Sequence, residues 1–357
     1  MPTPTPEETR RQRAADLLNG LKLDTLLVTS LHNVRYLTGF TGSSANALLY
    51  CDGSAILFTD PRYTVQAKQQ VNCAVRIAKG PLTKAVLAEI KSRRVSRVGF
   101  EPDHMTVARR EGFKTPDLVA VPEGFIAKLR MVKDEGEIAL IRSSVTLNSQ
   151  ALERALRRFK AGMTETALAA EIDYQSRRLG ADGAAFDTIV AAGARAALPH
   201  ARPGSAKIGP GILLIDMGAF CHGYASDMTR MAHVGRASAK YKRAYRAVLD
   251  AQLAAIDAIR PGATAGSIDR AARRTLKQHG LAREFVHSTG HGLGLEIHEG
   301  PRLGKSDKTR LEAGMTITIE PGIYVEGWGG IRIEDTVLVT RTGYEILTPT
   351  GKELVEI

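Results

Sequence analysis

A faint internal repeat in the C-terminal part of the chain is the feature that most constrains its fold. Lys160–Thr164 reads Lys-Ala-Gly-Met-Thr and Arg260–Thr264 reads Arg-Pro-Gly-Ala-Thr, and the helical pattern after each segment ends at Gly180 or Gly280. Glycine followed by threonine predicts a turn and a helix N-cap, and the later glycine predicts the helix end. The period is too long for a solenoid, so the repeat predicts duplication within one domain.

Each copy of the repeat is followed by strand patterns that carry acidic residues. The strands are predicted at Gly211–Asp216, Gly223–Val234, Met315–Glu320 and 331–336, and their carboxylates are Asp216, Asp227, Glu320 and Glu334. Alternation of apolar and polar residues puts Glu320 and Glu334 on the polar faces of their strands. The two Asp and the two Glu occupy matching places in the two halves, so a pseudo-two-fold arrangement would bring the four carboxylates together.

A run of histidine and glycine lies between these acidic segments. Three His and four Gly fall within the fifteen residues His287–Pro301. Glycine allows sharp turns and a close approach of the backbone to a ligand. Gly290, Gly292 and Gly294 superficially resemble a dinucleotide-binding loop, but the strand-to-helix context of such a loop is missing.

Four inward carboxylates cannot all stay ionised near one another without a counter-charge, and divalent cations supply one. One His with four carboxylates is a hard, oxygen-rich set that suits Mn²⁺ and accommodates Co²⁺, Zn²⁺ or Fe²⁺. Bridging carboxylates in a set of five would hold two ions ~3.5–4 Å apart, as in two-metal hydrolases. In the structural alternative, Asp227 merely pairs with Arg230 and Glu334 with Arg332.

Residues 1–130 alternate strand-like and helix-like segments, which predicts an α/β layer arrangement. The predicted strands are Thr25–Val28, Ala47–Tyr50, Ala55–Phe58 and Val98–Phe100, and the predicted helices are Glu7–Leu21 and Leu82–Lys91. Asp52-Gly53 predicts a hairpin turn. A charged stretch near Ala127–Glu135 leads into a long helical pattern and predicts a boundary, which gives two domains, 1–130 and 131–357.

The composition limits where the protein works. No run approaches the ~20 apolar residues of a membrane-spanning helix, and the first residues lack the apolar stretch of a secretory signal. Cys51, Cys73 and Cys221 are odd in number and form no CxxC pair, which favours reduced thiols. We therefore expect a cytoplasmic protein without a membrane partner.

The formal net charge of +11 raises the question of nucleic-acid binding. The basic residues are dispersed, and a helical cluster such as Arg270, Arg273, Arg274 and Lys277 is interpreted as a solvated face. Tyr241 and Tyr245 share one helix face and are predicted to pack against the core rather than to stack on bases. We expect no nucleic-acid partner.

Five segments together resemble the pita-bread metallopeptidases, and more narrowly their aminopeptidase P and prolidase branch. They are Asp216–Gly218, Gly223–Arg230, His287–Pro301, Thr318–Tyr324 and Gly330–Thr336. Asn33–Gly42 and Thr59–Tyr63 resemble the N-terminal domain of that branch. The resemblance implies a creatinase-like α/β N-terminal domain and a C-terminal pita-bread fold with a duplicated half.

The resemblance also assigns roles to single residues. The positions that match the five ligands of two metal ions are Asp216, Asp227, His291, Glu320 and Glu334. Glu320 would also relay the proton of the nucleophilic water. His200 would steady the scissile group, and His287 and His298 would contact the substrate or leaving group. Arg332 and Tyr324 would orient the carboxylates and other polar groups.

The implied activity is an Xaa-Pro aminopeptidase acting on short proline-containing peptides, in a homodimer whose N-terminal domains shape the partner's cleft. A prolidase, which accepts Xaa-Pro dipeptides only, is the alternative. Arg302 would then clamp the free carboxylate, or it is merely an exposed loop residue. Remote alternatives are a methionine aminopeptidase, a metal-free creatinase and a non-catalytic pita-bread binding protein.

Overall fold

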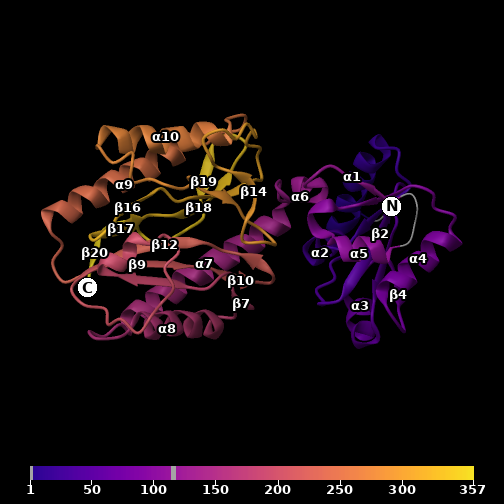
Figure 1. The fold of residues 1–357 in the computed structure, drawn as a ribbon, viewed down its shortest axis with the longest axis horizontal. Coiled ribbons are helices and arrows are strands. Elements are labelled where there is room, and N and C mark those ends of the chain that lie inside the picture. The colour runs from indigo at the N-terminus through magenta and orange to yellow at the C-terminus, as the bar shows by residue number, and fades with distance from the viewer. Residues whose placement is uncertain (1–2, 114–117) are drawn as a thin grey trace. The chain divides into compact units, whose positions relative to one another are not determined.

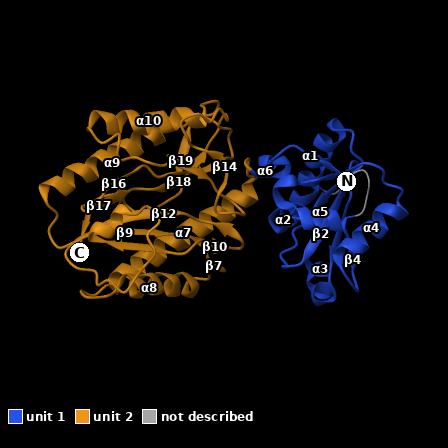
Figure 2. Cartoon of the chain, viewed as in Figure 1, with its two compact units in different colours: residues 1–130 blue, residues 131–357 orange. Residues whose placement is uncertain are grey.

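The computed structural model describes residues 3–113 and 118–357, and the chain divides into two compact units, residues 1–130 and 131–357 (Figure 2). In each unit, helices pack against β-strands (Figure 1). The mixed α/β class that the sequence predicts is confirmed.

Unit 1 is built on a six-stranded mixed sheet with the order β4-β3-β2-β1-β5-β6. The strands are β1 Thr25–Val28, β2 Ala45–Tyr50, β3 Ala55–Thr59, β4 Ala74–Ile77, β5 Val98–Phe100 and β6 Leu118–Ala120. The helices are α1 Pro6–Gly20, α2 Leu31–Thr38, α3 Thr64–Gln70, α4 Leu82–Ser92, α5 Val107–Gly112 and α6 Phe125–Arg130. Pairs β1–β2 and β2–β3 are antiparallel, whereas β1–β5, β5–β6 and β3–β4 are parallel.

The predicted elements of unit 1 are confirmed with ends that shift by at most two residues. The strands at Thr25–Val28 and Val98–Phe100 lie where the sequence places them. Asp52-Gly53 does connect β2 to β3, and Gly53 has a φ of 83°, a conformation that side chains with a Cβ rarely adopt. Apolar side chains of five strands, among them Leu27, Leu48 and Phe58, form one core with α4.

Unit 2 contains two helix pairs on opposite sides of its strands (Figure 1). The first pair is α7 Glu135–Arg157 with α8 Glu165–Arg178, and the second is α9 Ala239–Asp257 with α10 Ala265–Gln278. The arrangement matches the predicted duplication. Tyr241 and Tyr245 of α9 are buried in the core, as the sequence predicts.

The strands of unit 2 form four sheets. The first three are β11-β10-β7 (Tyr224–Ala225, Ala219–Cys221, Gly183–Ala184), β20-β12-β9-β8 (Val355–Glu356, Met228–Val234, Gly211–Met217, Ile189–Ala192) and the ribbon β16-β17 (Gly322–Val325, Gly329–Arg332). The fourth is β14-β13-β15-β18-β19 (Glu299–Arg302, His291–Gly292, Thr316–Ile319, Asp335–Val339, Tyr344–Ile346). Within the described residues there are three short 3₁₀ helices: η1 Pro61–Tyr63 and η2 Pro102–His104 in unit 1, and η3 Gly193–Ala197 in unit 2.

The two copies of the repeat differ at their helix starts. The Thr164 side chain accepts a hydrogen bond from the Ala167 N–H, as an N-cap should. The Thr264 side chain makes no such bond, so the predicted side-chain cap is wrong there. The Ser267 N–H, which such a cap would bind, donates instead to the Thr264 backbone carbonyl at 2.8 Å.

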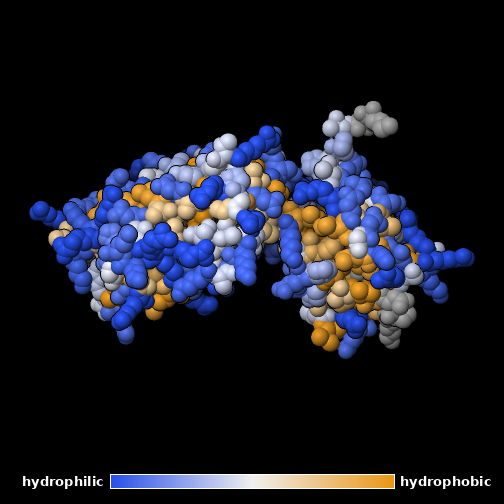
Figure 3. Space-filling view, turned by 90° about the horizontal axis from the view of Figure 1, so that it is seen from above, coloured by the Kyte–Doolittle hydropathy of each residue, from blue (hydrophilic) through white to orange (hydrophobic). Residues whose placement is uncertain are grey.

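On the face of unit 2 seen in Figure 3, hydrophilic residues are spread widely rather than gathered in one block. Within the described part of the chain, no helix is both long enough and apolar enough to cross a membrane.

Candidate metal centre

The five predicted ligands come from the ends and interruptions of strands. Asp216 lies near the end of β9, and Asp227 lies between β11 and β12. His291 begins β13, Glu320 follows the last residue of β15, and Glu334 lies between β17 and β18. The single predicted strand over residues 331–336 is therefore wrong, because the chain leaves the β16–β17 ribbon at Arg332 before it enters β18.

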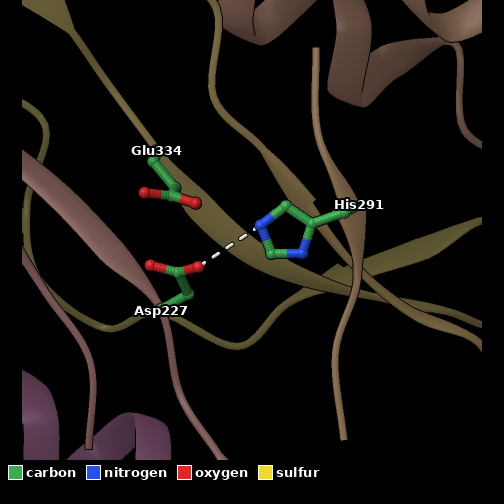
Figure 4. A group of neighbouring side chains, drawn as sticks. All are labelled: Asp227, His291 and Glu334. Atoms are coloured by element: carbon green, nitrogen blue, oxygen red, sulfur yellow. Dashed lines mark ion pairs between the residues drawn. The ribbon is translucent and has the colours of Figure 1, made fainter. Parts of the chain in front are cut away.

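Three of the five residues have ligand atoms within 4.8 Å of one another: Asp227, His291 and Glu334. Figure 4 shows both carboxylates pointing toward the imidazole. The His291 Nε2 atom lies 3.4 Å from Asp227 Oδ2 and 3.5 Å from Glu320 Oε1. The other ring nitrogen, Nδ1, lies 3.0 Å from the Gly292 carbonyl oxygen. If Nδ1 donates to that carbonyl, the Nε2 lone pair faces the carboxylates.

The charges of this cluster fit a cation. Burial, and then repulsion from neighbouring carboxylates, raises the pKa of Glu334 well above its usual value, and burial raises the pKa of Asp227 to about 7. Burial lowers the pKa of His291, but the adjacent Asp227 and Glu320 outweigh it and raise that pKa to about 9. Asp216 Oδ1 is buried without a hydrogen-bond partner among the described residues. The donor set and the unpartnered oxygen suit hard divalent ions.

Arg332 fixes one side of the cluster. Its guanidinium donates to Asp216 Oδ2 at 2.6 Å, to Thr229 Oγ1 at 3.0 Å and to the Tyr324 hydroxyl at 2.6 Å. Thr229 in turn donates to Glu334 Oε2 at 2.7 Å. Two carboxylates are thus oriented from one buried cation.

The simple ion pairs considered from the sequence are wrong. Arg230 does not pair with Asp227 but with Asp335, at 2.7 Å, and it also donates to the Glu334 carbonyl. Arg332 pairs with Asp216 rather than with Glu334. The carboxylates of Asp227 and Glu334 therefore remain available to a ligand.

The three further histidines surround the cluster differently. The His298 ring lies edge-on to His291, with centroids 4.4 Å apart. His287 Nε2 lies 2.9 Å from the Tyr324 hydroxyl, and His200 is exposed just after η3. Burial lowers the pKa of His287 and, together with nearby His291, that of His298. Near neutral pH, both rings are therefore mostly neutral and can donate or accept a hydrogen bond.

A cavity of about 640 Å³ contains the whole arrangement. All predicted site residues line it except Tyr324, which is buried behind Arg332 and His287. Those lining residues are Asp216, Asp227, His291, Glu320, Glu334, His200, His287, His298, Arg302 and Arg332. The structure thus brings the predicted set together around one space.

Three supporting residues lie outside the predicted set. The sequence pattern predicts a solvated position for Arg273, but its guanidinium pairs with buried Asp269 at 2.7 Å and donates to the carbonyls of Phe285 and His287. Asp269 also accepts a hydrogen bond from the Thr289 hydroxyl at 2.9 Å. Thr229, described above, lies two residues after Asp227, a spacing that could have indicated a shared strand face.

Comparison with known protein families gives two matches. Residues 139–341 match the model described as metallopeptidase family M24, and residues 10–132 match the creatinase/prolidase N-terminal domain. The chain belongs to metallopeptidase family M24. The M24 match contains every residue of the candidate metal centre.

Solved and curated members of family M24 resemble this chain over nearly its full length. An Xaa-Pro dipeptidase of Pyrococcus horikoshii is 36% identical over 96% of this chain and 98% of the relative. The structure of an Xaa-Pro dipeptidase from Bacillus anthracis matches with a TM-score of 0.95 and 35% identity, covering 98% of this chain and all of the other. The structure of an X-Pro aminopeptidase from Thermotoga maritima matches with a TM-score of 0.90 and 34% identity, covering 97% of this chain and 100% of the other. The predicted family and two-domain fold are confirmed.

Proposed function

We propose that this M24 protein is a two-metal exopeptidase that hydrolyses the Xaa–Pro bond at the N-terminus of peptides. The observation that carries the proposal is the convergence of five potential ligands in one cavity with His287, His298 and Arg332. The dipeptidase and aminopeptidase names of the similar structures support the same bond preference.

Asp216, Asp227, His291, Glu320 and Glu334 would hold two divalent ions, and the donor set favours Mn²⁺. When bound, such ions supply Lewis acidity and a strong nucleophile at neutral pH. The carboxylate of Glu320 takes the proton of the attacking water and passes it to the leaving proline nitrogen. Glu320 suits this role because it lines the cavity and the Thr318 hydroxyl donates to its Oε1 at 3.2 Å.

The surrounding residues would bind and orient the peptide. His298, edge-on to His291, donates to a substrate carbonyl, and His287 contacts the leaving group. His200, which lines the cavity next to Pro199, steadies the scissile group. Arg332 and Tyr324 keep Asp216 and His287 in place through the hydrogen bonds described above, so they act by positioning.

An Xaa-Pro dipeptidase is the second candidate, and Arg302 favours it. This side chain lines the metal cavity, where a guanidinium can hold the free carboxylate of a dipeptide in a bidentate pair. The homodimer and the cytoplasmic location remain predictions. Sedimentation equilibrium tests the first, and the three free thiols support the second.

The test is hydrolysis of Ala-Pro and Ala-Pro-Ala-Ala by metal-stripped protein and by the same protein reloaded with Mn²⁺. Release of alanine from at least one peptide only after reloading supports the proposal. Asp227→Asn, which is nearly isosteric, should remove this activity while the circular dichroism spectrum stays that of the parent. Equal turnover by the variant, or no cleavage of either peptide, would contradict it.

A further inference from the structure

A second hollow, of about 600 Å³, opens beside the metal cavity. The two spaces share three lining residues, His287, Ser288 and Arg302. We call this hollow the side groove and define it by those three residues with Arg273, Phe285, Val286 and Gly304–Asp307. Because these three residues line both spaces, the side groove and the metal cavity adjoin at His287, Ser288 and Arg302.

One wall of the side groove is cationic. Arg302 and Lys305 both line it, and neither side chain forms an ion pair with a carboxylate of the described residues. Asp307, also in the lining, is a carboxylate that accepts a hydrogen bond from the Thr309 N–H at 2.7 Å and keeps its negative charge, and Arg273 is paired with Asp269. Arg302 and Lys305 together outweigh Asp307, so the net charge of the groove is positive, which suits a carboxylate.

Two apolar residues also line the side groove, and there is open space beside Gly304. Phe285 is buried, and the adjacent Val286 is 67% exposed. At Gly304 an added Cβ would meet nothing closer than the Ser288 Cβ, at 3.9 Å, and its φ lies outside the positive range. Glycine is therefore not needed there for the backbone, and its missing side chain leaves room along the groove.

We propose that the side groove binds the residues that follow proline in peptides of three or more residues, with the C-terminal carboxylate held by Lys305 and Arg302. This inference rests on the proposed function, since it uses the proposed contact between His287 and the leaving group. An apolar residue after proline lies against Val286. The enzyme is then an aminopeptidase that accepts longer peptides, not a strict dipeptidase.

The experiment compares kcat/KM for Ala-Pro, Ala-Pro-Leu and Ala-Pro-Leu amide with the Mn²⁺-loaded full chain. We expect cleavage of Ala-Pro-Leu, and a weaker reaction with the amide. In Lys305→Gln the ratio of kcat/KM for Ala-Pro-Leu to that for its amide should fall about tenfold, the loss of one charged hydrogen bond. Lys308→Gln, which removes the same charge three residues away outside the groove, is the matched control and should leave the ratio unchanged.

Gly304→Leu fills the groove without strain on the backbone and should lower kcat/KM for Ala-Pro-Leu relative to Ala-Pro about tenfold or more. Calorimetric binding of Ala-Pro-Leu to the metal-free protein should weaken in the same variant. Cleavage of Ala-Pro with no cleavage of Ala-Pro-Leu overturns the groove proposal alone, and cleavage of neither overturns the proposed function as well. A change of sedimentation in Lys305→Gln without a change of the ratio would assign the groove to a contact between copies and would also overturn it.

Discussion

Replacing Arg332 with leucine should destabilise unit 2 strongly in the absence of metal. The Arg332 side chain is buried and donates to Asp216, Thr229, Tyr324 and the carbonyl of Pro199. Among the described residues, Arg332 is the only cation that donates a hydrogen bond to Asp216, and leucine removes it. Burial is the main cause of the raised pKa of Asp216. Without Arg332, the buried Asp216 carboxylate therefore either stays charged without a partner or takes up a proton.

The size of the effect follows from the burial of both partners. Removing one member of a buried ion pair costs about 3–5 kcal/mol. Since unit 2 covers residues 131–357, and a domain of 150–250 residues loses roughly 2–4 °C in Tm per kcal/mol, we expect a fall of roughly 6–20 °C. Arg332→Lys keeps the charge but not the planar fork, so its fall should be smaller.

Differential scanning calorimetry of the parent and both variants, with and without Mn²⁺, measures this directly. Bound divalent cations compensate the Asp216 charge, so the loss in Arg332→Leu should shrink when metal is present. An equal loss in both conditions would refute the idea that Asp216 faces the ions. A metal-free Tm unchanged from the parent would refute the energetic role of Arg332.

Three further predictions concern other residues. Burial raises the pKa of Glu101 in unit 1 from 4.5 to about 7. The folded state therefore binds this proton more tightly than the unfolded state, and the free energy of unfolding should fall as pH rises from about 4.5 to about 7. Glu101→Gln should lack this fall, so in denaturant titrations its free energy of unfolding, relative to the parent, should be up to about 3 kcal/mol higher at pH 8 than at pH 4. Arg273→Lys should lower kcat for Ala-Pro about tenfold at unchanged metal content, because the His287 backbone loses its anchor, whereas exposed Arg274→Lys should not. His298→Ala should lower turnover much more than metal content measured by atomic absorption.

Each of these has an outcome that would contradict it. A parallel pH dependence in Glu101→Gln and the parent would remove Glu101 as the cause. Equal kcat in the Arg273 and Arg274 variants would leave Arg273 without a positioning role. Loss of metal in His298→Ala would make that histidine a ligand.

Local patterns in the sequence were sufficient for much of the fold. The β2–β3 hairpin follows from Asp52-Gly53 between two apolar runs, and the helix starting after Thr164 follows from its N-cap. The matching places of the acidic residues in the two halves led to the expectation that they converge, and they line one cavity. These features depend on residues close in sequence or on the repeat.

Features that depend on long-range contacts were missed. Arg332 and Asp216 are more than a hundred residues apart, so no periodicity indicates their pairing. Arg273 has the helical spacing of an exposed residue, but in the structure it is half-buried and donates to the carbonyl of His287, fourteen residues further along the chain. The break between β17 and β18 at Glu334 arises because the residues up to Arg332 pair with β16, whereas those from Asp335 onward pair with β15 of another sheet.

Two ions held between the five carboxylate and imidazole side chains are the basis of the proposed chemistry, and anomalous X-ray scattering locates such ions most directly. Crystals grown with Mn²⁺ and measured at the manganese edge should show two peaks ~3.5–4 Å apart, bounded by Asp216, Asp227, His291, Glu320 and Glu334. A single peak, or peaks away from these residues, would contradict the two-metal centre.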